Sequence, residues 1–578
     1  MLNPPPKRWE LADPPDPVDP EQAADLARAV GCSPFAARLL LQRGIRTAEE
    51  AYRFLHPSLD DLPDASLLPD AEAAAERIAR AVARREPIIV HGDYDSDGVT
   101  SAALWMRLLT RLQADVQVHV PHRILDGYDL RRGFIESARR RGIRLIITCD
   151  CGVQRWEEVE LARSYGIDVI ITDHHRPGER LPRAVAVVNP NRADAAYPFR
   201  HLSGAGVAFR TGELVVRKLG LNVDTYRRAY VDLAAIGTVT DAMPLLEENR
   251  AIVYWGLRRI PQSPKVGLRA LLASAQLLGR PITSRDIAFG MGPRLNAVGR
   301  VGDARVALEL LLTNDAAQAG ELAKRLEAAN SERQRAQNRI LQEALAQLDA
   351  EDEDGRTCIV LKGHNWHQGV VGIVATKIVE QFHRPTILIA ADDASQSGRG
   401  SARSIPALDI HRAISECRQF LTEFGGHTHA AGLALSLADF DNFREAMNRV
   451  TSEMLTPEDL QPVLTANLKI DPGDTTPELL AELARFEPWG VGNDEPIFLS
   501  TGVEVADVRR IGREGEHLKL LLNTSRGQRE ALYWGQGALA EMLSPAARVD
   551  LCYRIQENRY SGGPSVQLCI VDLRLPER

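Results

Sequence analysis

Residues 87–104 read PIIVHGDYDSDGVTSAAL, and this stretch decides how the rest of the chain is interpreted. The apolar run at 88–90 predicts a buried strand, and the small and apolar residues from Gly98 onward predict a helix. Between the two stand one imidazole and three carboxylates: His91, Asp93, Asp95 and Asp97. Like charges held this close repel one another, so we expect a cation to be bound among them.

Two other kinds of loop share part of this spacing. An EF-hand calcium loop needs a bidentate Glu at its twelfth position, but the twelfth residue counted from Asp93 is Leu104, so that interpretation fails. An aspartyl-phosphatase loop, in which the first Asp of a DxDG turn is phosphorylated, fits Asp95-Ser96-Asp97-Gly98 locally. Residues further along the chain must decide between this loop and a metal centre.

The composition is that of a globular protein with several domains. The chain has 578 residues, of which 44% are hydrophobic and 26% charged, and this length predicts three or four domains. We find no apolar run of membrane-spanning length, and the first ten residues lack the order of a signal peptide. Seven cysteines without a CxxC pair argue against a disulfide framework or a structural zinc site. We therefore expect a cytoplasmic protein that does not bind membranes.

The formal net charge of −8 argues at first sight against a nucleic-acid partner, because phosphate binding needs Lys and Arg. Six of the acidic residues, however, are ones whose charge a pair of divalent ions would largely offset: Asp93, Asp95, Asp97, Asp150, Asp173 and Asp241. The 70 Lys and Arg residues can then be concentrated along a channel. Net charge therefore does not exclude nucleic acid.

Strand-like and helix-like segments alternate from residue 87 to about residue 241. The segments LIITCD and VIITDHH end at Asp150 and at His175, and helical patterns lie between the strand-like runs. Such alternation predicts right-handed crossovers and a parallel sheet, whose strands all end at the same edge. Ligands gather at that edge in open parallel sheets, so we expect the acidic and histidine clusters to converge there.

The later clusters differ in how specific they are. Asp150 alone would more often be a helix cap, and Asp241 alone a turn residue. The sequence Asp173-His174-His175 is more specific, because two adjacent histidines after a strand are poor core residues. They suit metal ligation with a second imidazole left for acid, base or oxyanion chemistry.

Taken together, the motifs His91-Gly92-Asp93-Tyr94-Asp95-Ser96-Asp97-Gly98, Cys149-Asp150-Cys151-Gly152, Asp173-His174-His175 and Thr240-Asp241 resemble those of the DHH phosphoesterases. Within that superfamily the chain is similar to the branch of single-strand-specific 5′→3′ DNA exonucleases. The aspartyl-phosphatase loop accounts for the first motif only and is set aside.

The resemblance implies two divalent ions. One would be held by His91, Asp95 and Asp150, and the other by Asp97, Asp150, His174 and Asp241, with Asp150 bridging. It further implies a catalytic group in which His175 meets the scissile phosphate, while Asp93 and Asp173 orient ligands or contact the ions through water. Mixed carboxylate and imidazole ligation favours Mn²⁺, and Mg²⁺ could substitute.

Several further residues are candidates for phosphate binding. Arg123 follows a predicted strand, but the next residues, 126–129, read DGYD where the family has Glu-Gly-Tyr-Gly. Residues 292–300 predict a polar loop that carries Arg294, Asn296 and Arg300, and guanidinium groups bind phosphate through two oxygens at once. Glycine-rich loops at 397–404 and 425–432 contribute Arg399, Ser401, Arg403 and His427. By the resemblance, Ser401 and Arg403 contact the 5′ phosphate.

The remaining segments complete the expected architecture. Residues 315–350 predict one long helix, residues 355–449 a second α/β unit similar to the DHH-associated domain, and the short strand-like runs after 464 an OB-like β-barrel. We thus expect an α/β fold in which a parallel-sheet DHH domain is joined by a long helix to a smaller α/β DHH-associated domain, followed by the barrel. The expected boundaries are 1–85 for an N-terminal arm and helical cap, 86–314 for the DHH domain, 315–354 for the connecting helix, 355–463 for the DHH-associated domain and 464–578 for the barrel.

The function implied is a single-strand-specific 5′→3′ DNA exonuclease that hydrolyses phosphodiesters with two metals, releases 5′-mononucleotides and serves DNA repair and recombination. A helicase and a single-strand-binding protein are the expected partners, and the chain is expected to be a monomer. An alternative is a phosphodiesterase for short oligonucleotides or cyclic dinucleotides. A second alternative is a replication scaffold without catalysis, which the complete set of ligands disfavours.

Overall fold

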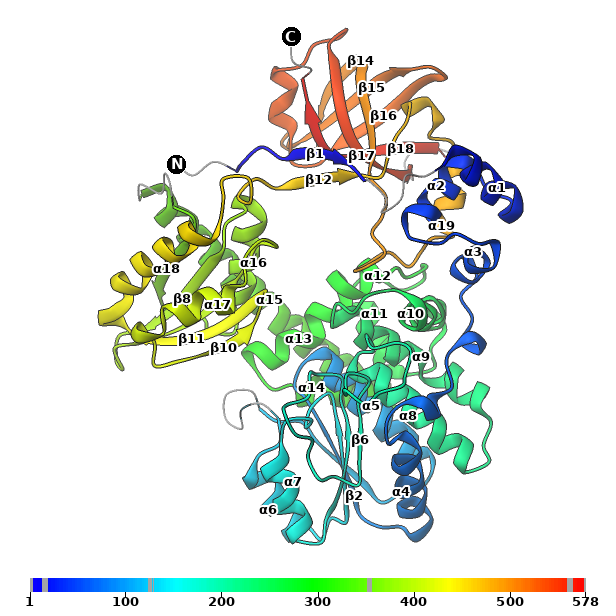
Figure 1. Ribbon diagram of the computed structural model, residues 1–578, viewed down its shortest axis with the longest axis vertical. Coiled ribbons are helices and arrows are strands. Elements are labelled where there is room, and N and C mark those ends of the chain that lie inside the picture. Colours follow the sequence, from blue (N-terminus) through cyan, green and yellow to red (C-terminus); the bar gives the residue numbers. More distant parts are fainter. Residues whose placement is uncertain are drawn as a thin grey trace. The chain divides into compact units, whose positions relative to one another are not determined.

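The computed structural model describes residues 4–12, 19–122, 127, 129–350, 356–558 and 565–575 (Figure 1). The chain forms two compact units. One comprises residues 1–8, 122–127 and 293–464, and the other residues 9–121, 128–292 and 465–578. No helix among the described residues is both long enough and apolar enough to cross a membrane. Arg123, Asp126, Tyr128 and the acidic run at 351–354 lie outside the described residues.

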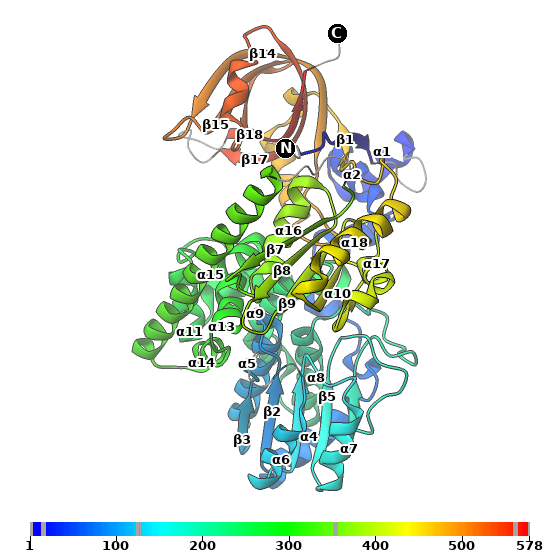
Figure 2. The same ribbon diagram turned by 90° about the vertical axis from the view of Figure 1, so that its left-hand side faces the viewer.

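The larger unit is built around a five-stranded parallel sheet of order β3-β2-β4-β5-β6. The strands are β2 (Ile88–Gly92), β3 (Val116–His119), β4 (Leu145–Cys149), β5 (Asp168–Thr172) and β6 (Ala186–Val188), and their side-by-side arrangement is visible in Figure 2. β2 and β4 are entirely buried, as expected for apolar strands covered on both faces. The predicted parallel sheet is therefore confirmed.

Helices cover both faces of this sheet (Figure 1). One face carries α6 (Arg132–Arg140) and α7 (Trp156–Ser164), and the other carries α4 (Ala71–Arg84), α5 (Ser96–Arg111) and α8 (Gly204–Lys218). Beyond α8 lie α9 (Val223–Thr240), α10 (Glu247–Arg259), α11 (Val266–Ser274) and α12 (Ser284–Asp286). Because every βα connection returns over the sheet, the turns after β2, β4 and β5 open at one edge.

A closed barrel completes this unit. β14 (Phe498–Ile511), β15 (His517–Thr524), β16 (Gly527–Tyr533), β18 (Ser565–Arg574) and β17 (Arg548–Asn558) pair in that order, and a further β14–β17 pairing closes the ring. The predicted OB-like barrel is confirmed. Of its aromatic side chains, Tyr553 is buried in the core, Trp534 is 51% exposed, and Tyr560 is outside the described residues.

The N-terminal segment differs from the expected arm and cap. Residues 8–11 form strand β1 (Arg8–Leu11), and α1 (Pro20–Val30) begins before residue 25, where the expected irregular arm was to end. The apolar residues of α1, α2 (Pro34–Gln42) and α3 (Ala48–Leu55) share one core with the barrel and α19 (Pro477–Ala484). The helices α1, α2 and α3 thus cover the barrel, because their leucines find apolar partners there. Of the four N-terminal helices, α4 is the one that packs on the parallel sheet.

The smaller unit contains the predicted long helix, α15 (Ala316–Ala350), preceded by α13 (Gly292–Val301) and α14 (Arg305–Leu312). Its sheet has the order β10-β11-β9-β8-β7, in which only β7 and β8 are parallel. The strands are β7 (Ile359–His364), β8 (Thr386–Asp392), β9 (Ser397–Arg403), β10 (Glu423–His427) and β11 (Ala430–Ser436). In the chain, α16 (Val371–Phe382) lies between β7 and β8, α17 (Ile410–Glu416) lies between β9 and β10, and α18 (Phe440–Met454) follows β11. The strand β12 (Val463–Ala466) spans the boundary of this unit, and β13 (Leu468–Lys469), which pairs with β14, belongs to the larger unit.

Three predicted loops are wrong. Residues 292–300 lie in helix α13, because their apolar positions are buried on one side of a helix. Residues 397–404 and 425–432 lie largely in β9, β10 and β11. A Cβ at Gly398 would lie 2.6 Å from Ile389, and one at Gly400 would lie 2.9 Å from Leu433. These glycines therefore permit close packing within a sheet, where the sequence suggested turns.

Candidate metal centre

The predicted ligands come from the carboxyl ends of neighbouring strands. His91 is in β2, Asp150 follows β4, and Asp173, His174 and His175 follow β5. Asp150 adopts a positive φ of 64°, a conformation that Asp tolerates better than most side chains. Asp241 arrives from elsewhere, as the residue that ends α9. The convergence that the alternating sequence predicts is thus found.

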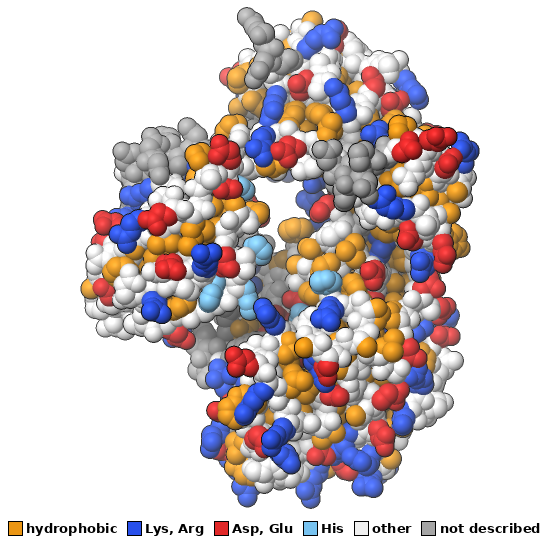
Figure 3. Space-filling model, in the orientation of Figure 1, with side chains coloured by type: hydrophobic (Ala, Val, Ile, Leu, Met, Phe, Trp, Pro, Cys, Tyr) orange, Lys and Arg blue, Asp and Glu red, His pale blue; other side chains and the backbone are white. Residues whose placement is uncertain are grey.

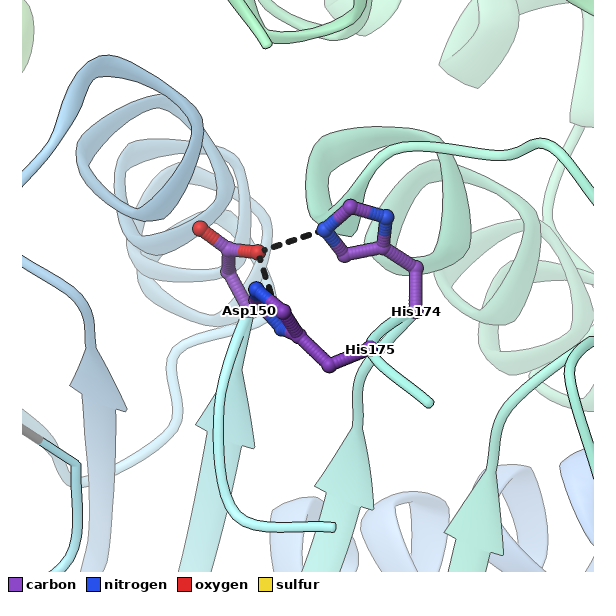
Figure 4. Close-up of side chains that lie close together, drawn as sticks. All are labelled: Asp150, His174 and His175. Carbon is purple, nitrogen blue, oxygen red and sulfur yellow. Dashed lines mark ion pairs between the residues drawn. The ribbon is translucent and has the colours of Figure 1, made fainter. Parts of the chain in front are cut away.

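His174 lies at the centre of the cluster. Its Nε2 atom is 3.1 Å from Asp150 Oδ1, 3.5 Å from Asp241 Oδ2 and 3.9 Å from Asp97 Oδ2. His175 approaches the same Asp150 oxygen from its Nδ1 atom at 3.9 Å, as Figure 4 shows. One carboxylate oxygen therefore faces two imidazoles.

Three compact groups of candidate ligand atoms occur among the described residues, each with its atoms within 4.8 Å of one another. They are Asp97, His174 and Asp241; Asp150, His174 and His175; and Asp93, Asp95 and Asp150. The first matches three of the four ligands expected for one ion. The third brings Asp95 and Asp150 together with Asp93, whereas His91 joins none of these groups within the described chain.

Buried atoms without hydrogen-bond partners test whether the cluster suits a cation. In the described part of the chain, five ligand atoms are buried and make no hydrogen bond: His91 Nε2, Asp93 Oδ1, Asp150 Oδ1, His174 Nε2 and Asp241 Oδ2. Among them, His174 Nε2 has the ion-pair contacts with the three carboxylates described above. Leaving a buried polar atom unsatisfied costs about 1–3 kcal/mol, and more for a charged group. These donor atoms are oxygens and imidazole nitrogens, which together suit divalent ions such as Mn²⁺. The residues therefore fit a divalent metal centre.

Asp97 is fixed by the beginning of helix α8. The backbone N–H groups of Gly204 and Ala205 donate to its two carboxylate oxygens at 2.6 and 2.9 Å. The N-terminus of a helix favours such a negative charge. Gly204 also leaves room for the neighbouring ligand, because a Cβ there would lie 2.5 Å from the Cβ of Asp150. α8 thus positions two of the candidate ligands.

The carboxyl groups hold their protons more tightly than usual. Burial and the charge of Asp95 raise the pKa of Asp97 to about 7, and burial and the charge of Asp97 raise the pKa of Asp241 to about 9. The pKa values of Asp93 and Asp150 are also raised, first by burial and then by neighbouring carboxylates. A bound cation reverses this effect, because it favours the ionised form.

The imidazoles fall into two states. Burial lowers the pKa of His91 to about 3 and that of His174 to about 4, so both are neutral near pH 7, which is the form that binds metals. In His175 the effect of burial is outweighed by a hydrogen bond to Asp173, and the pKa rises to about 9. His175 is therefore charged at neutral pH, and its side chain is 44% exposed.

Asp173 is held by protein groups. Its Oδ1 atom lies 2.8 Å from His175 Nδ1 and accepts from the backbone N–H of His174, and its Oδ2 atom accepts from the N–H of Val153 at 3.0 Å. Although burial raises it, the hydrogen bond from His175 leaves the pKa of Asp173 at about 2. Asp173 thus serves to orient the His174-His175 turn.

Two asparagines that the sequence analysis did not single out hold the same turn. The amide of Asn189 donates to the carbonyl of His175 at 2.8 Å, and that of Asn191 donates to the carbonyl of His174 at 2.5 Å. Both follow β6, the next strand of the sheet. Their position after a fourth strand end, in the sequence Asn189-Pro190-Asn191, was the signal that could have identified them.

The predicted phosphate-binding residues lie in the smaller unit, except Arg123, which is outside the described residues. Arg399, Ser401 and Arg403 alternate along β9, and both Arg403 and His427 are in register with Ala430 of β11, so these four side chains share one face of the sheet. The Arg403 guanidinium donates to Ser401 Oγ at 3.0 Å. A Cβ at Gly372, in the first turn of α16, would lie within 2.9 Å of both side chains. Ser401 and Arg403 therefore stand beside a helix N-terminus, a common setting for phosphate.

The residues of α13 are engaged within their own unit. Arg294 forms an ion pair with Glu327 at 2.6 Å, and Arg300 donates to the carbonyl of Gly369 at 3.2 Å. Asn296 is half-buried in the same helix. On the face drawn in Figure 3, basic and acidic side chains are interspersed.

Comparisons with known proteins agree with this architecture. Family models match residues 87–238 (DHH family, N-terminal domain), 355–453 (DHHA1 domain) and 466–572 (RecJ OB domain). The single-stranded-DNA-specific exonuclease RecJ of Bacillus subtilis is 36% identical over 573 residues, covering 99% of this chain and 71% of that protein. The Escherichia coli exonuclease of the same name is 33% identical over 585 residues, covering 95% and 97%.

Solved structures of a RecJ protein also match this chain over nearly its whole length. RecJ of Thermus thermophilus in complex with Mn²⁺ matches with a TM-score of 0.84 at 34% identity, covering 99% of this chain and 80% of that one. The complex of the same protein with Mg²⁺ matches with a TM-score of 0.79 at 33% identity, with coverage of 99% and 79%.

Proposed function

The chain belongs to the RecJ family of single-stranded-DNA-specific exonucleases, and we propose that it removes mononucleotides from the 5′ end of single-stranded DNA at a centre of two divalent ions. The observation that carries this proposal is the set of buried, unsatisfied ligand atoms at the edge of the parallel sheet. Relatives crystallised with Mn²⁺ and with Mg²⁺ support a divalent metal, and the mixed ligand set favours Mn²⁺.

The ligands divide between two positions. Asp97, His174 and Asp241 would hold one ion, and Asp93, Asp95 and Asp150, with His91 nearby on β2, would hold the other. Asp150 is placed to serve both, since its Oδ1 atom is unsatisfied and faces His174. When bound, such ions neutralise phosphate charge and lower the pKa of water, which accounts for a reaction without a Ser or Cys nucleophile.

His175 would contact the scissile phosphate. Its Nδ1 atom is held by Asp173, so the proton for a phosphate oxygen would come from the opposite ring nitrogen, Nε2. The raised pKa of about 9 keeps this imidazole charged at neutral pH. Asp173, the amide of Asn189 and the amide of Asn191 fix its orientation.

The 5′ phosphate would be bound by Ser401 and Arg403 at the beginning of α16, with Arg399 and His427 on the same face of that sheet. Arg123, Arg294, Asn296 and Arg300 remain candidates for further contacts with the strand. We place the enzyme in DNA repair and recombination in the cytoplasm, acting as a monomer beside a helicase and a single-strand-binding protein.

The proposed activity is tested by comparing a long single strand with a dinucleotide, and a label at the 5′ end of the strand with a label at its 3′ end. A long 5′-phosphorylated single strand labelled at its 5′ end should release labelled mononucleotide from the first time points with Mn²⁺. The same strand labelled at its 3′ end should shorten stepwise. Equal or faster hydrolysis of a dinucleotide would favour a short-oligonucleotide phosphodiesterase, and early release of the 3′ label would reverse the direction.

A further inference from the structure

His91 is flanked by two rings that lie outside the ligand set. Its Nδ1 atom is 3.1 Å from the Nδ1 atom of His119, and its ring centroid is 4.4 Å from that of Phe134. His91 and His119 occupy matching positions on the neighbouring parallel strands β2 and β3. Parallel register therefore places the two imidazoles side by side on one face of the sheet.

The two imidazoles meet edge to edge. Their planes differ by only 14°, and their facing nitrogens are 3.1 Å apart while their centroids are 5.1 Å apart. Stacked rings would bring the centroids as close as the nitrogens. The contact is therefore a hydrogen bond between ring nitrogens, in which one imidazole donates and the other accepts.

The direction of that hydrogen bond decides whether His91 can bind a metal. A neutral imidazole carries one proton, so a proton on Nδ1 leaves a bare lone pair on Nε2, and a proton on Nε2 blocks it. His91 Nε2 is buried and has no well-aligned hydrogen-bond partner within the described chain, although the backbone of Asp129 lies close enough to the ring to raise its pKa. A protonated Nε2 would be a buried donor without a well-aligned acceptor, whereas an unprotonated one can bind a cation.

We propose that His119 is a positioning residue, which accepts the Nδ1 proton of His91 and so holds the His91 Nε2 lone pair ready for a divalent ion. The proposal rests on the proposed metal centre and adds to it a partner that none of its ligand groups contains. Metal-binding histidines usually donate their other N–H to such a partner, and losing it costs about 10–100-fold in metal affinity or activity. Here the partner is a second imidazole on the edge strand of the sheet.

The experiment separates the hydrogen bond from packing. His119→Phe keeps an aromatic ring beside Phe134 and removes the acceptor, whereas His119→Asn places an amide oxygen close to where Nδ1 lies. Mn²⁺ binding to each full-length variant is measured by electron paramagnetic resonance of the free ion. Thermal unfolding in EDTA confirms that the variants fold.

We expect His119→Phe to weaken Mn²⁺ binding about 10–100-fold at one of the sites. His119→Asn should recover affinity to within a few-fold of the parent. A parent-like affinity in His119→Phe, or an equal loss in His119→Asn, would overturn the proposal.

The double variant with His91→Ala tests whether His119 acts through His91. Its Mn²⁺ affinity should equal that of His91→Ala alone, because the interaction is already lost. An additive loss would contradict the proposal, as would parent-like Mn²⁺ binding in His91→Ala itself. Because the measurement needs no DNA, a protein that shows these Mn²⁺ affinities but fails to degrade single strands would refute the proposed function and leave this inference standing.

Discussion

Among the buried clusters of charged side chains in the larger unit, two are neutralised in different ways. In the first, here called the Arg210 cluster, Arg210 pairs with Glu248 at 2.7 Å and with Glu213, which also pairs with Arg227 at 2.8 Å. Two guanidiniums therefore balance two carboxylates. At the sheet edge, the side chains that lie within ion-pair distance of Asp97, Asp150 and Asp241 among the described residues are imidazoles, and His174 is largely neutral at pH 7.

This difference separates buried charges that stabilise the fold from buried charges that are kept to bind a cation. A buried ion pair with both partners present holds helices together, and removing one partner is costly. A buried cluster in which carboxylates outnumber cationic partners weakens the metal-free fold and is retained where a bound cation completes it. The predictions below perturb one cluster at a time.

The largest effect should follow from replacing the shared carboxylate. Asp150→Asn should lower the rate of DNA cleavage by about 10³-fold or more, since the interactions it supports are worth several kcal/mol at the transition state. In EDTA its unfolding temperature should equal or exceed that of the parent, because one repelling carboxylate is gone. Initial rates and thermal unfolding measure the two quantities, and retained turnover would exclude a bridging role.

Breaking the Arg210 cluster should have the opposite pattern. Glu248→Gln leaves Arg210 with one carboxylate fewer and should reduce the free energy of unfolding by about 3 kcal/mol, with or without Mn²⁺. Glu247→Gln, the same change at the exposed neighbouring residue, is the control and should have little effect. Urea unfolding measures the free energy of unfolding of both variants. A loss of stability in Glu248→Gln that depends on Mn²⁺ would contradict the distinction between the two clusters.

Crowding Asp150 without removing it should give an intermediate effect. Gly204→Ala places a Cβ 2.5 Å from Asp150 and should weaken Mn²⁺ binding about tenfold, or about 1.4 kcal/mol. Gly133→Ala is the matched helix control, because nothing lies within 4 Å of its Cβ position. Calorimetric titration with Mn²⁺ compares them, and equal affinities would show that α8 can shift to accommodate the methyl group.

The remaining effect concerns pH. The folded, metal-free protein keeps protons on Asp97 up to about pH 7 and on Asp241 and His175 up to about pH 9, whereas the unfolded chain releases them earlier. The folded state therefore binds more protons, and stability should fall as pH rises from 7 to 9.

We expect the unfolding temperature in EDTA to fall by a few degrees over that range, and saturating Mn²⁺ to remove most of the fall. The variant Asp241→Asn should show a flatter profile, because it lacks one of the titrating groups. A pH profile that is equally steep in this variant would assign the effect to other residues.

The sequence predicts the site better than its surroundings. Strand ends at 92, 149 and 172 could be placed because apolar runs alternate with helical patterns, and parallel strands must end at one edge. Asp241 needed the family resemblance, because it ends a helix and no periodicity places it beside the sheet.

Residues that act through neighbours in space were missed. His119 carries no pattern of its own, and Asn189 and Asn191 are marked only by following a strand end, so their contacts are recognised only once strand order and register are known. Glycines at 398 and 400 were taken for turns, because close packing between strands and a tight turn select the same residue. For the helices at 20–55 the sequence predicted a helical cap without naming the surface that it covers, because an apolar helix face does not specify its partner.

The most direct test of the central claim is an anomalous diffraction map from crystals soaked in Mn²⁺. The account predicts two manganese peaks at the carboxyl edge of the parallel sheet, one bordered by Asp97, His174 and Asp241 and the other by Asp93, Asp95 and Asp150. A map without peaks at this edge, or with manganese only elsewhere, would contradict it.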